Sequence, residues 1–170
     1  MRRSPFRPGD GGAIEAELPE PAAETLEHLA GELIEALGSP QDPGLRRLFP
    51  PAYATDERAQ AEYESLTRDE LTDGKRIAAQ RVIDSVEAGA RRGGTWRAQL
   101  DAEASSAWLA VLNDARLVLG TRLDVTDETY DAELAEDDPA LPAHNLYLYL
   151  GALEEALVDA LAEQLDTDGR

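Results

Sequence analysis

The chain has 170 residues and a formal net charge of −19, with 35 acidic residues against 16 basic ones. It contains no cysteine, which excludes disulfides, zinc–thiolate sites, iron–sulfur ligation and any thiol redox switch. Aromatic residues make up only 5% of the chain, so we expect a core built mainly from Leu, Val and Ala. Because Ala and Leu favour helices and β-branched residues are sparse, the composition predicts a helical protein.

The negative charge is concentrated in the C-terminal part of the chain. Residues 123–170 carry 14 acidic residues and one Arg, a net charge of −13, whereas residues 1–122 have a net charge of −6. Such a field repels phosphate backbones, which provide most of the non-specific affinity for nucleic acids. Direct DNA binding would therefore require a separate basic surface, and a basic protein partner is favoured.

The N-terminal segment predicts neither a signal peptide nor a membrane anchor. MRRSPFRPGDGG is basic but has no apolar stretch after its arginines. No apolar run in the chain is long enough to cross a bilayer. We therefore expect a cytoplasmic protein without membrane association. The prolines and glycines of residues 1–12 predict a flexible N-terminal arm, followed by a single helical domain over residues 13–170.

The first half of that domain is predicted to contain three helices. Residues 13–18, AIEAEL, alternate apolar and polar and predict a short strand with little to pair with. A leucine-patterned helix over 24–37 follows, and Asp42 caps a short helical turn. A helix capped by Thr55 is expected over 56–66. Thr67 and Glu70 form a capping box that predicts a new helix to about residue 88.

The second half begins with a glycine turn at 90–96 and continues with a helix over about 100–120. Thr126 is expected to cap a short helix over 127–134, and an acidic, proline-marked loop leads to a final helix over 145–165. Leu146, Leu150, Leu153, Leu157 and Leu161 form one stripe of that helix. The predicted fold class is all-α, a single bundle of about five to six helices, with at most one short N-terminal strand.

The stretch WLAVLNDARLVLGTRLDV (108–125) carries polar groups on a helix that is apolar on several sides. Such a helix is central in its bundle, so its polar groups must be hydrogen-bonded. We expect Arg116 to pair with a carboxylate of another helix and Asn113 to cap a neighbouring backbone end. The favoured hypothesis is an internal polar network that fixes helix register; a ligand site is the alternative.

Other candidate sites are weaker. Glu24, His28 and Glu32 share one helical face and form a metal-site candidate, but a solvated polar face explains them better. Tyr147 and Tyr149, near His144, either line a pocket or pack against the leucine stripe, and packing is favoured. No catalytic constellation is present, so we expect neither an enzyme nor a cofactor.

Two basic segments are candidate nucleic-acid contacts. One is the N-terminal arm, for which a frayed terminus is the favoured interpretation. The other lies in the glycine turn, where pairing with the acidic C-terminal half of the chain explains the arginines equally well. The candidate residues are Arg2, Arg3, Arg7, Arg91, Arg92 and Arg97.

The 108–125 stretch, together with LRRLFPPAY and EYESLTRDEL upstream, resembles an actinobacterial family of domains of unknown function. The similarity runs from AIEAEL to the last helix, and W-L-x-x-L-N-D-x-R-L-x-L-G-T-R-L is its most specific motif. The family includes an oxidative-stress transcriptional regulator that works with a stress sigma factor. The signature positions of the family in this chain are Trp108, Asn113, Asp114, Arg116, Gly120, Thr121 and Arg122.

This resemblance implies a transcription-associated stress regulator that acts through protein–protein contacts, with a sigma factor as the candidate basic partner. The redox-sensing member of the family has a C-x-x-x-C pair near its start, where this chain reads RRSPFRPGD. A disulfide switch is therefore excluded here. Two alternative functions stay open, a direct DNA-binding regulator and a small-molecule or metal-binding helical protein. The oligomeric state is open as well, with a homodimer as one option.

Overall fold

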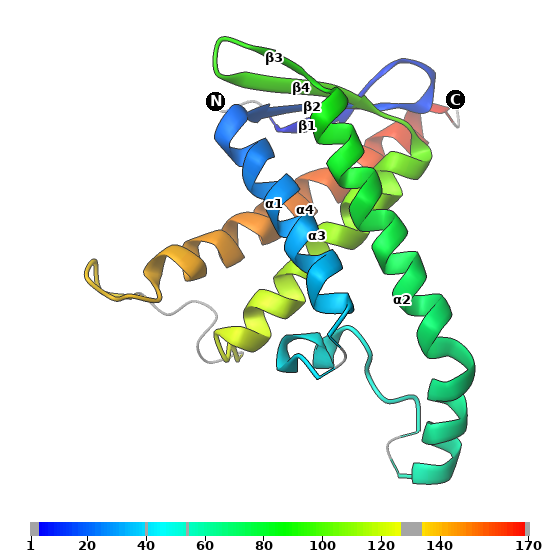
Figure 1. The fold of residues 1–170 in the computed structure, drawn as a ribbon. Helices are drawn as coiled ribbons and strands as arrows, with labels where there is room; N and C mark the ends of the chain where they lie inside the picture. The colour runs from blue at the N-terminus through cyan, green and yellow to red at the C-terminus, as the bar shows by residue number, and fades with distance from the viewer. Residues whose placement is uncertain (1–3, 40, 54, 127–133, 169–170) are drawn as a thin grey trace.

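The protein combines a small antiparallel sheet with long helices (Figure 1). The computed structural model describes residues 4–39, 41–53, 55–126 and 134–168. The sheet lies across one end of the helices, and its strand order is β1-β2-β4-β3. In chain order, the described elements are β1 (Phe6–Pro8), the 3-10 turn η1 (Asp10–Gly12), β2 (Ile14–Pro19), α1 (Glu20–Leu37), the 3-10 turn η2 (Pro43–Arg47), α2 (Glu57–Ala88), β3 (Ala90–Arg92), β4 (Thr95–Leu100), α3 (Ala102–Arg122) and α4 (Leu141–Asp168).

The prediction of an all-α bundle of five to six helices is wrong. The described residues form four α-helices and a four-stranded sheet. The strand predicted at 13–18 is present as β2, but it lies inside the sheet rather than alone. It pairs with β1 on one side and with β4 on the other, where Leu18 is opposite Trp96. The pairing was missed because its partner strand lies about 80 residues away in sequence, beyond the reach of local patterns.

The glycine turn predicted at 90–96 is the tip of a β-hairpin. Gly93 and Gly94 both have positive φ, at 60° and 75°, as a two-residue hairpin turn requires. The strands on either side, β3 and β4, were not predicted. β3 has only three residues, and β4 alternates between an inward face with Trp96 and Leu100 and an outward face with Arg97.

Part of the segment predicted as a flexible arm has regular secondary structure. Residues 6–8 form the edge strand β1, and the side chain of Phe6 is only 1% exposed. Its ring meets Trp108 edge-on, with 6.1 Å between ring centroids. Pairing with β2 and burial of the Phe6 side chain together hold this segment in the sheet. Arg2 and Arg3 lie outside the described residues.

The helices predicted separately at 56–66 and from Thr67 onward form one continuous helix, α2. Asp56, rather than Thr55, caps it by accepting hydrogen bonds from the backbone amides of Arg58 and Ala59. Thr67 Oγ donates to the carbonyl of Tyr63, as a hydroxyl inside a helix does. No proline or glycine interrupts residues 57–73, so the capping-box pattern alone did not end the helix.

The core lies between the sheet and the helices. Trp96 of β4 stacks on Trp108 of α3, with 5.4 Å between ring centroids and 22° between planes. The indole N–H of Trp96 donates to the carbonyl of Val86 at 2.9 Å. A Cβ at Gly89 would lie 2.0 Å from that indole nitrogen. The absence of a side chain at position 89 is therefore what allows Trp96 to pack against the end of α2.

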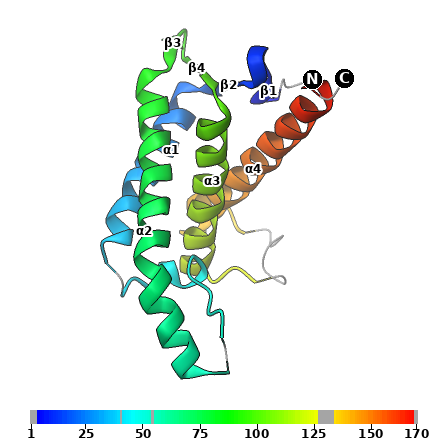
Figure 2. The same cartoon turned by 90° about the vertical axis from the view of Figure 1, so that its right-hand side faces the viewer.

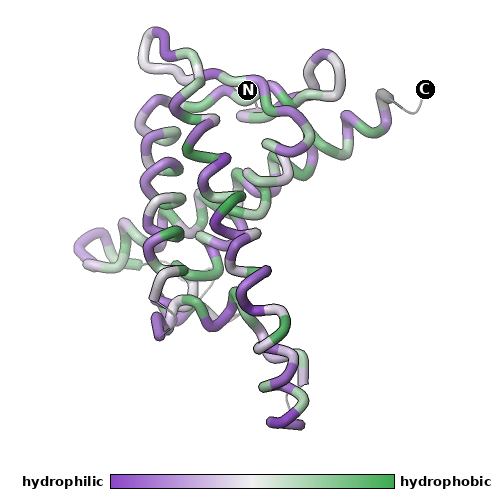
Figure 3. The backbone as a smooth tube through the Cα atoms, turned by 45° about the vertical axis from the view of Figure 1, so that its right-hand side comes forward, coloured by the Kyte–Doolittle hydropathy of each residue, from purple (hydrophilic) through white to green (hydrophobic). Residues whose placement is uncertain are grey.

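The helix α3 is central, as predicted from its apolar pattern. It packs against α2, α4 and η2, and α4 crosses it obliquely (Figure 2). The leucine stripe predicted for the last helix faces the core, with Leu150, Leu153 and Leu157 buried. The N-terminal half of α2 projects away from the rest of the molecule and carries many hydrophilic residues (Figure 3).

Two further observations concern the second half of the chain. The short helix predicted at 127–134 lies almost entirely outside the described residues. None of the helices in the described part of the chain has a stretch that is both long and apolar enough to span a bilayer.

Candidate functional site

The charged signature residues of α3 form separate ion pairs with three other elements. Asp114 pairs with α2, Arg116 with α4, and Arg122 with the segment before η2. No hydrogen bond between described residues connects these pairs to one another. The structure therefore has three separate ion pairs where a single internal network was predicted. The side chains of these pairs become more exposed toward the C-terminal end of α3.

The contact between Asp114 and Lys75 is the most buried of the three. The ammonium group of Lys75 lies 2.8 Å from both carboxylate oxygens of Asp114, which is 3% exposed. Burial raises the pKa of the Asp114 carboxyl above its ordinary value, and the nearby Lys75 ammonium opposes that rise. Because the carboxylate is almost fully buried and both of its oxygens contact Lys75, it is not open to a ligand from solvent. This pair fixes α2 against α3.

Arg116 pairs with Glu154 of α4 at 3.0 Å, which confirms the expected carboxylate on another helix. Its guanidinium also lies 5.4 Å from the centre of the Tyr147 ring. Burial acts to lower the pKa of Arg116, but the hydrogen bond to Glu154 and the contact with Tyr147 leave it raised. The side chain of Arg116 is 31% exposed, so the contact lies at the edge of the core rather than inside it.

Gly120 belongs to the same contact. A Cβ at position 120 would lie 3.0 Å from the Tyr147 ring, so the glycine makes room for a buried tyrosine of α4. The expectation that Tyr147 packs rather than lines a pocket fits this position. Tyr149 differs, because it is 37% exposed, and its partial burial raises the pKa of its phenol.

Arg122 and Thr121 end α3 against the η2 segment. Arg122 donates to Asp42 at 3.2 Å, and Asp42 also accepts the backbone N–H of Gly44, as predicted for the cap of this turn. Thr121 donates to the carbonyl of Leu117 within its own helix. Arg47 of η2 donates in return to the carbonyl of Val125, just after α3. These contacts hold the η2 turn against the end of α3.

Two signature residues, Asn113 and Trp108, have side-chain polar groups without a hydrogen-bond partner among the described residues. The described residues contain no hydrogen-bond partner for the Asn113 side chain, so the predicted capping role is not seen there. Trp108 is 1% exposed, and its indole N–H has no hydrogen-bond partner in the described part of the chain. Its contribution is packing against Trp96 and Phe6.

Sequence reasoning missed the partners of these residues, namely Lys75, Glu154 and Asp42. One signal was available for the first of them, since Lys75 is the only lysine in a chain whose other cations are arginines. Glu154 follows the buried Leu153 in a helix rich in acids, and nothing local distinguishes it from its neighbour Glu155. Partner choice depends on which helices cross, and short-range patterns do not contain that information.

Most of the candidate nucleic-acid contacts in the described residues are neutralised by acidic neighbours. Arg7 pairs with Glu15 across β1 and β2, and Arg97 pairs with Glu17 across β4 and β2. Arg91 lies 3.6 Å from Glu20 at the start of α1. Only Arg92 has no acidic partner among the described residues. The outer face of the sheet is therefore an alternation of charges and not a basic surface.

The metal-site candidate on α1 is a solvent-exposed pair. His28 lies 3.6 Å from Glu32, and the His28 side chain is 76% exposed. No group of three or more potential metal ligands is present among the residues that the structure describes. This arrangement is typical of a solvated helical face.

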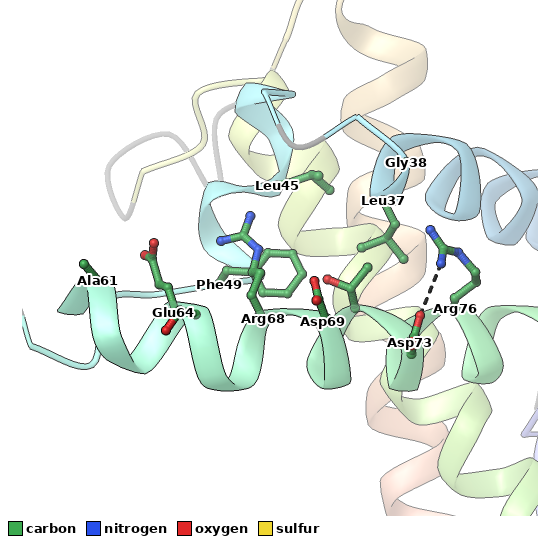
Figure 4. Close-up of a pocket in the computed structure, with 12 residues that line it drawn as sticks. Leu37, Gly38, Leu45, Phe49, Ala61, Glu64, Arg68, Asp69, Asp73 and Arg76 are labelled. Carbon is green, nitrogen blue, oxygen red and sulfur yellow. Dashed lines mark hydrogen bonds and ion pairs between the residues drawn. The ribbon is translucent and has the colours of Figure 1, made fainter. Parts of the chain in front are cut away.

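A hollow of about 830 Å³ lies between the end of α1, η2 and the projecting half of α2 (Figure 4). Leu37, Leu45 and Phe49 form its apolar floor, and the guanidinium of Arg68 lies 3.9 Å from the centre of the Phe49 ring. Charged residues of both signs surround it, and Arg76 is already paired with Asp73. The hollow contains none of the family-signature residues, and its mixed charge does not define a ligand.

Comparisons with known proteins agree with the resemblance drawn from the motif. The family described as Domain of unknown function (DUF2017) matches residues 1–161. The oxidative stress regulator AosR of Mycobacterium tuberculosis is 33% identical over 149 residues, which cover 80% of this chain and 66% of the relative. The same figures hold for AosR of Mycobacterium bovis.

A putative oxidative stress regulator AosR of Mycobacterium leprae is also 33% identical, over 135 residues that cover 72% of this chain and 59% of the relative. The chain thus spans slightly less than two thirds of the length of these curated relatives. No solved structure matches it.

Proposed function

Because the chain belongs to the DUF2017 family, with relatives named as oxidative stress regulators, we propose that it is a stress-response regulator that acts by binding a basic protein partner. A sigma factor is the partner class we favour, and the binding is not controlled by a cysteine switch, since the chain has no cysteine. The observation that carries the proposal is that Glu155, Asp159 and Asp166 of α4 have no cationic partner among the described residues.

The distribution of charge supports a protein partner over DNA. Within α4, Glu155, Asp159 and Asp166 make no ion pair with any other described residue, and residues 123–168 contain no Lys or Arg. In contrast, Arg7, Arg91 and Arg97 on the sheet are paired with carboxylates. A basic protein therefore finds complementary charge on α4, whereas the net charge of −19 repels a phosphate backbone.

The α3 residues support a regulatory rather than a catalytic role. Asp114, Arg116 and Arg122 are all engaged in contacts between secondary-structure elements. A general acid or base must be free to reach a substrate proton, and these groups are already bound. We assign the signature residues to maintaining the fold that presents α4.

The test is binding of the full chain to purified sigma factors of an actinobacterium, measured by biolayer interferometry. We expect at least one sigma factor to bind at about 0.05 M salt and to lose most of its affinity at about 0.5 M, where screening is strong. A mobility-shift assay with promoter DNA at the lower salt should show no shift. Absence of any sigma-factor binding, or binding that is insensitive to salt, would contradict the proposal.

A further inference from the structure

On one side of α4, apolar side chains are exposed between acidic ones. Leu148, Val158 and Leu165 are 37%, 47% and 74% exposed. Their spacing along the helix places them on one side, together with small residues and acids. We call this surface the outer face of α4; it consists of Leu148, Gly151, Ala152, Glu155, Val158, Asp159, Ala162, Leu165 and Asp166.

The outer face of α4 is hollowed at its N-terminal half. A depression of about 420 Å³ is lined by Leu148, Gly151, Ala152, Glu155 and Val158, with Arg116 and Glu154 at its side. The glycine and alanine lower the helix surface between larger apolar residues, which allows another backbone to approach closely. Arg116 contributes little net positive charge here because Glu154 neutralises it.

The charge of this surface determines what can cover it. Glu155, Asp159 and Asp166 lie among the apolar residues and have no cationic partner in the described residues. Two copies of the same face would bring these acids together, and like charges across an interface are costly. A covering partner must therefore bring apolar side chains at helical spacing and cations beside them.

We propose that the outer face of α4 docks a basic amphipathic helix of a partner protein. Apolar residues of that helix fill the depression between Leu148 and Val158, and its Lys or Arg side chains reach Glu155, Asp159 and Asp166. Recognition of an amphipathic helix by an apolar groove is a common mode of protein binding. The inference rests on the proposed function, since it places the basic partner on one surface.

A second acidic surface on the molecule provides a matched control. On α1, Glu24 and Glu35 are exposed and belong to a group of acids around a hollow of about 560 Å³. Neither of them makes an ion pair with another described residue. Among the residues that line this hollow, only Ile83 has an aliphatic side chain, and it is half-buried. This surface resembles the outer face of α4 in charge but not in apolar exposure.

The first experiment uses a synthetic helical peptide of about 18 residues, with Leu at i, i+3, i+4 and i+7 and Lys elsewhere. Because the chain has no cysteine, Ala162→Cys gives a single dye site on the outer face of α4, and Ser65→Cys gives one on α2. We expect saturable binding that changes the fluorescence of the dye at 162 and leaves the dye at 65 unchanged. A response only from the dye at 65 would overturn the proposal.

The second experiment compares two charge reversals that alter the net charge equally. Glu155→Lys with Asp159→Lys should weaken peptide binding about tenfold or more, whereas Glu24→Lys with Glu35→Lys should weaken it less than about threefold. Val158→Ser with Leu165→Ser should also weaken it, and a peptide with the same Lys content but scrambled Leu positions should bind poorly. Equal losses for the two charge reversals would overturn the assignment to α4.

The remaining outcomes separate this inference from the proposed function. A sigma factor that binds the wild-type chain and the Glu155→Lys/Asp159→Lys chain alike would leave the proposed function standing and remove α4 as the docking surface. If the peptide docks on α4 but no sigma factor binds the chain, α4 stands as a docking surface and the proposed sigma-factor partner is contradicted. Sedimentation showing a wild-type dimer that Val158→Ser/Leu165→Ser dissociates would assign this face to a second copy and overturn the proposal.

Discussion

The helices α3 and α4 both carry charged residues, but those residues have different roles. On α3, Asp114, Arg116 and Arg122 each contact a different element. On the outer face of α4, the acids have no such partners among the described residues. Charges that are bound inside a structure specify how its elements pack, while unpaired charges at the surface attract partners. The comparison teaches that the charged signature residues of this chain bind other elements of its own fold, while the acids of the outer face of α4 lie open to solvent.

The largest effect should come from removing Lys75. Lys75→Met leaves Asp114 buried without its cation, and breaking a buried pair in this way costs about 3 kcal/mol of unfolding free energy. Urea unfolding at neutral pH measures this loss. The double variant Lys75→Met/Asp114→Leu, which removes both charges, should regain most of it. A single variant as stable as the wild type would show that the pair is not needed to hold α2 on α3.

The pH dependence of that variant sharpens the same point. Burial already raises the pKa of Asp114, and loss of Lys75 raises it further above its value in the unfolded chain, about 3.9. A carboxyl with a raised pKa contributes stability that is complete below its unfolded pKa and is lost as pH rises through its folded pKa. The deficit of Lys75→Met relative to Lys75→Met/Asp114→Leu should therefore be smallest near pH 4 and grow toward neutral pH.

Replacing one glycine on α3 and one on α4 should change the free energy of unfolding by smaller amounts and in opposite directions. Gly120→Ala on α3 places a Cβ 3.0 Å from the buried Tyr147 ring, and the crowding should cost about 1 kcal/mol. Gly151→Ala on α4 places a Cβ 3.5 Å from Arg116, an ordinary contact, so better helix propensity should stabilise the fold by about 0.5 kcal/mol. Thermal unfolding of both variants checks the opposite signs.

The smallest effect on stability should come from the outer face of α4. Glu155→Lys/Asp159→Lys removes no ion pair within the described structure, so its unfolding free energy should stay within about 0.5 kcal/mol of the wild type. Denaturant unfolding checks this directly. A loss above about 2 kcal/mol would mean that these acids are structural, as those of α3 are, and the contrast between the helices would disappear.

Helical content and the central position of α3 could be predicted from the sequence, because apolar periodicity determines which side of a helix is buried. The stripe of Leu150, Leu153 and Leu157 and the cap at Asp42 were confirmed for the same local reason. The alternation in residues 13–18 also correctly predicted a strand. Each of these features depends on residues within a few positions of one another.

The sheet could not be predicted in the same way. β1 and β3 have three residues each, too few for a clear alternation. Their stability comes from pairing with β2 and β4 and from burying Phe6 and Trp96 on Trp108, contacts that join distant parts of the chain. The capping-box pattern at Thr67 failed because a capping motif ends one helix and begins another only where the chain also turns.

The sequence by itself determined the acidity of the C-terminal region, the absence of a thiol switch, the helical character of most of the chain and the family signature. Only the tertiary structure decided that Asp114 would bind Lys75, that Arg116 would bind Glu154 and that Arg7, Arg91 and Arg97 of the sheet would each lie beside a carboxylate. It also decided which face of α4 stays open to solvent. The physical reason is that composition and periodicity are local properties, whereas ion pairs and open surfaces depend on which elements cross in three dimensions.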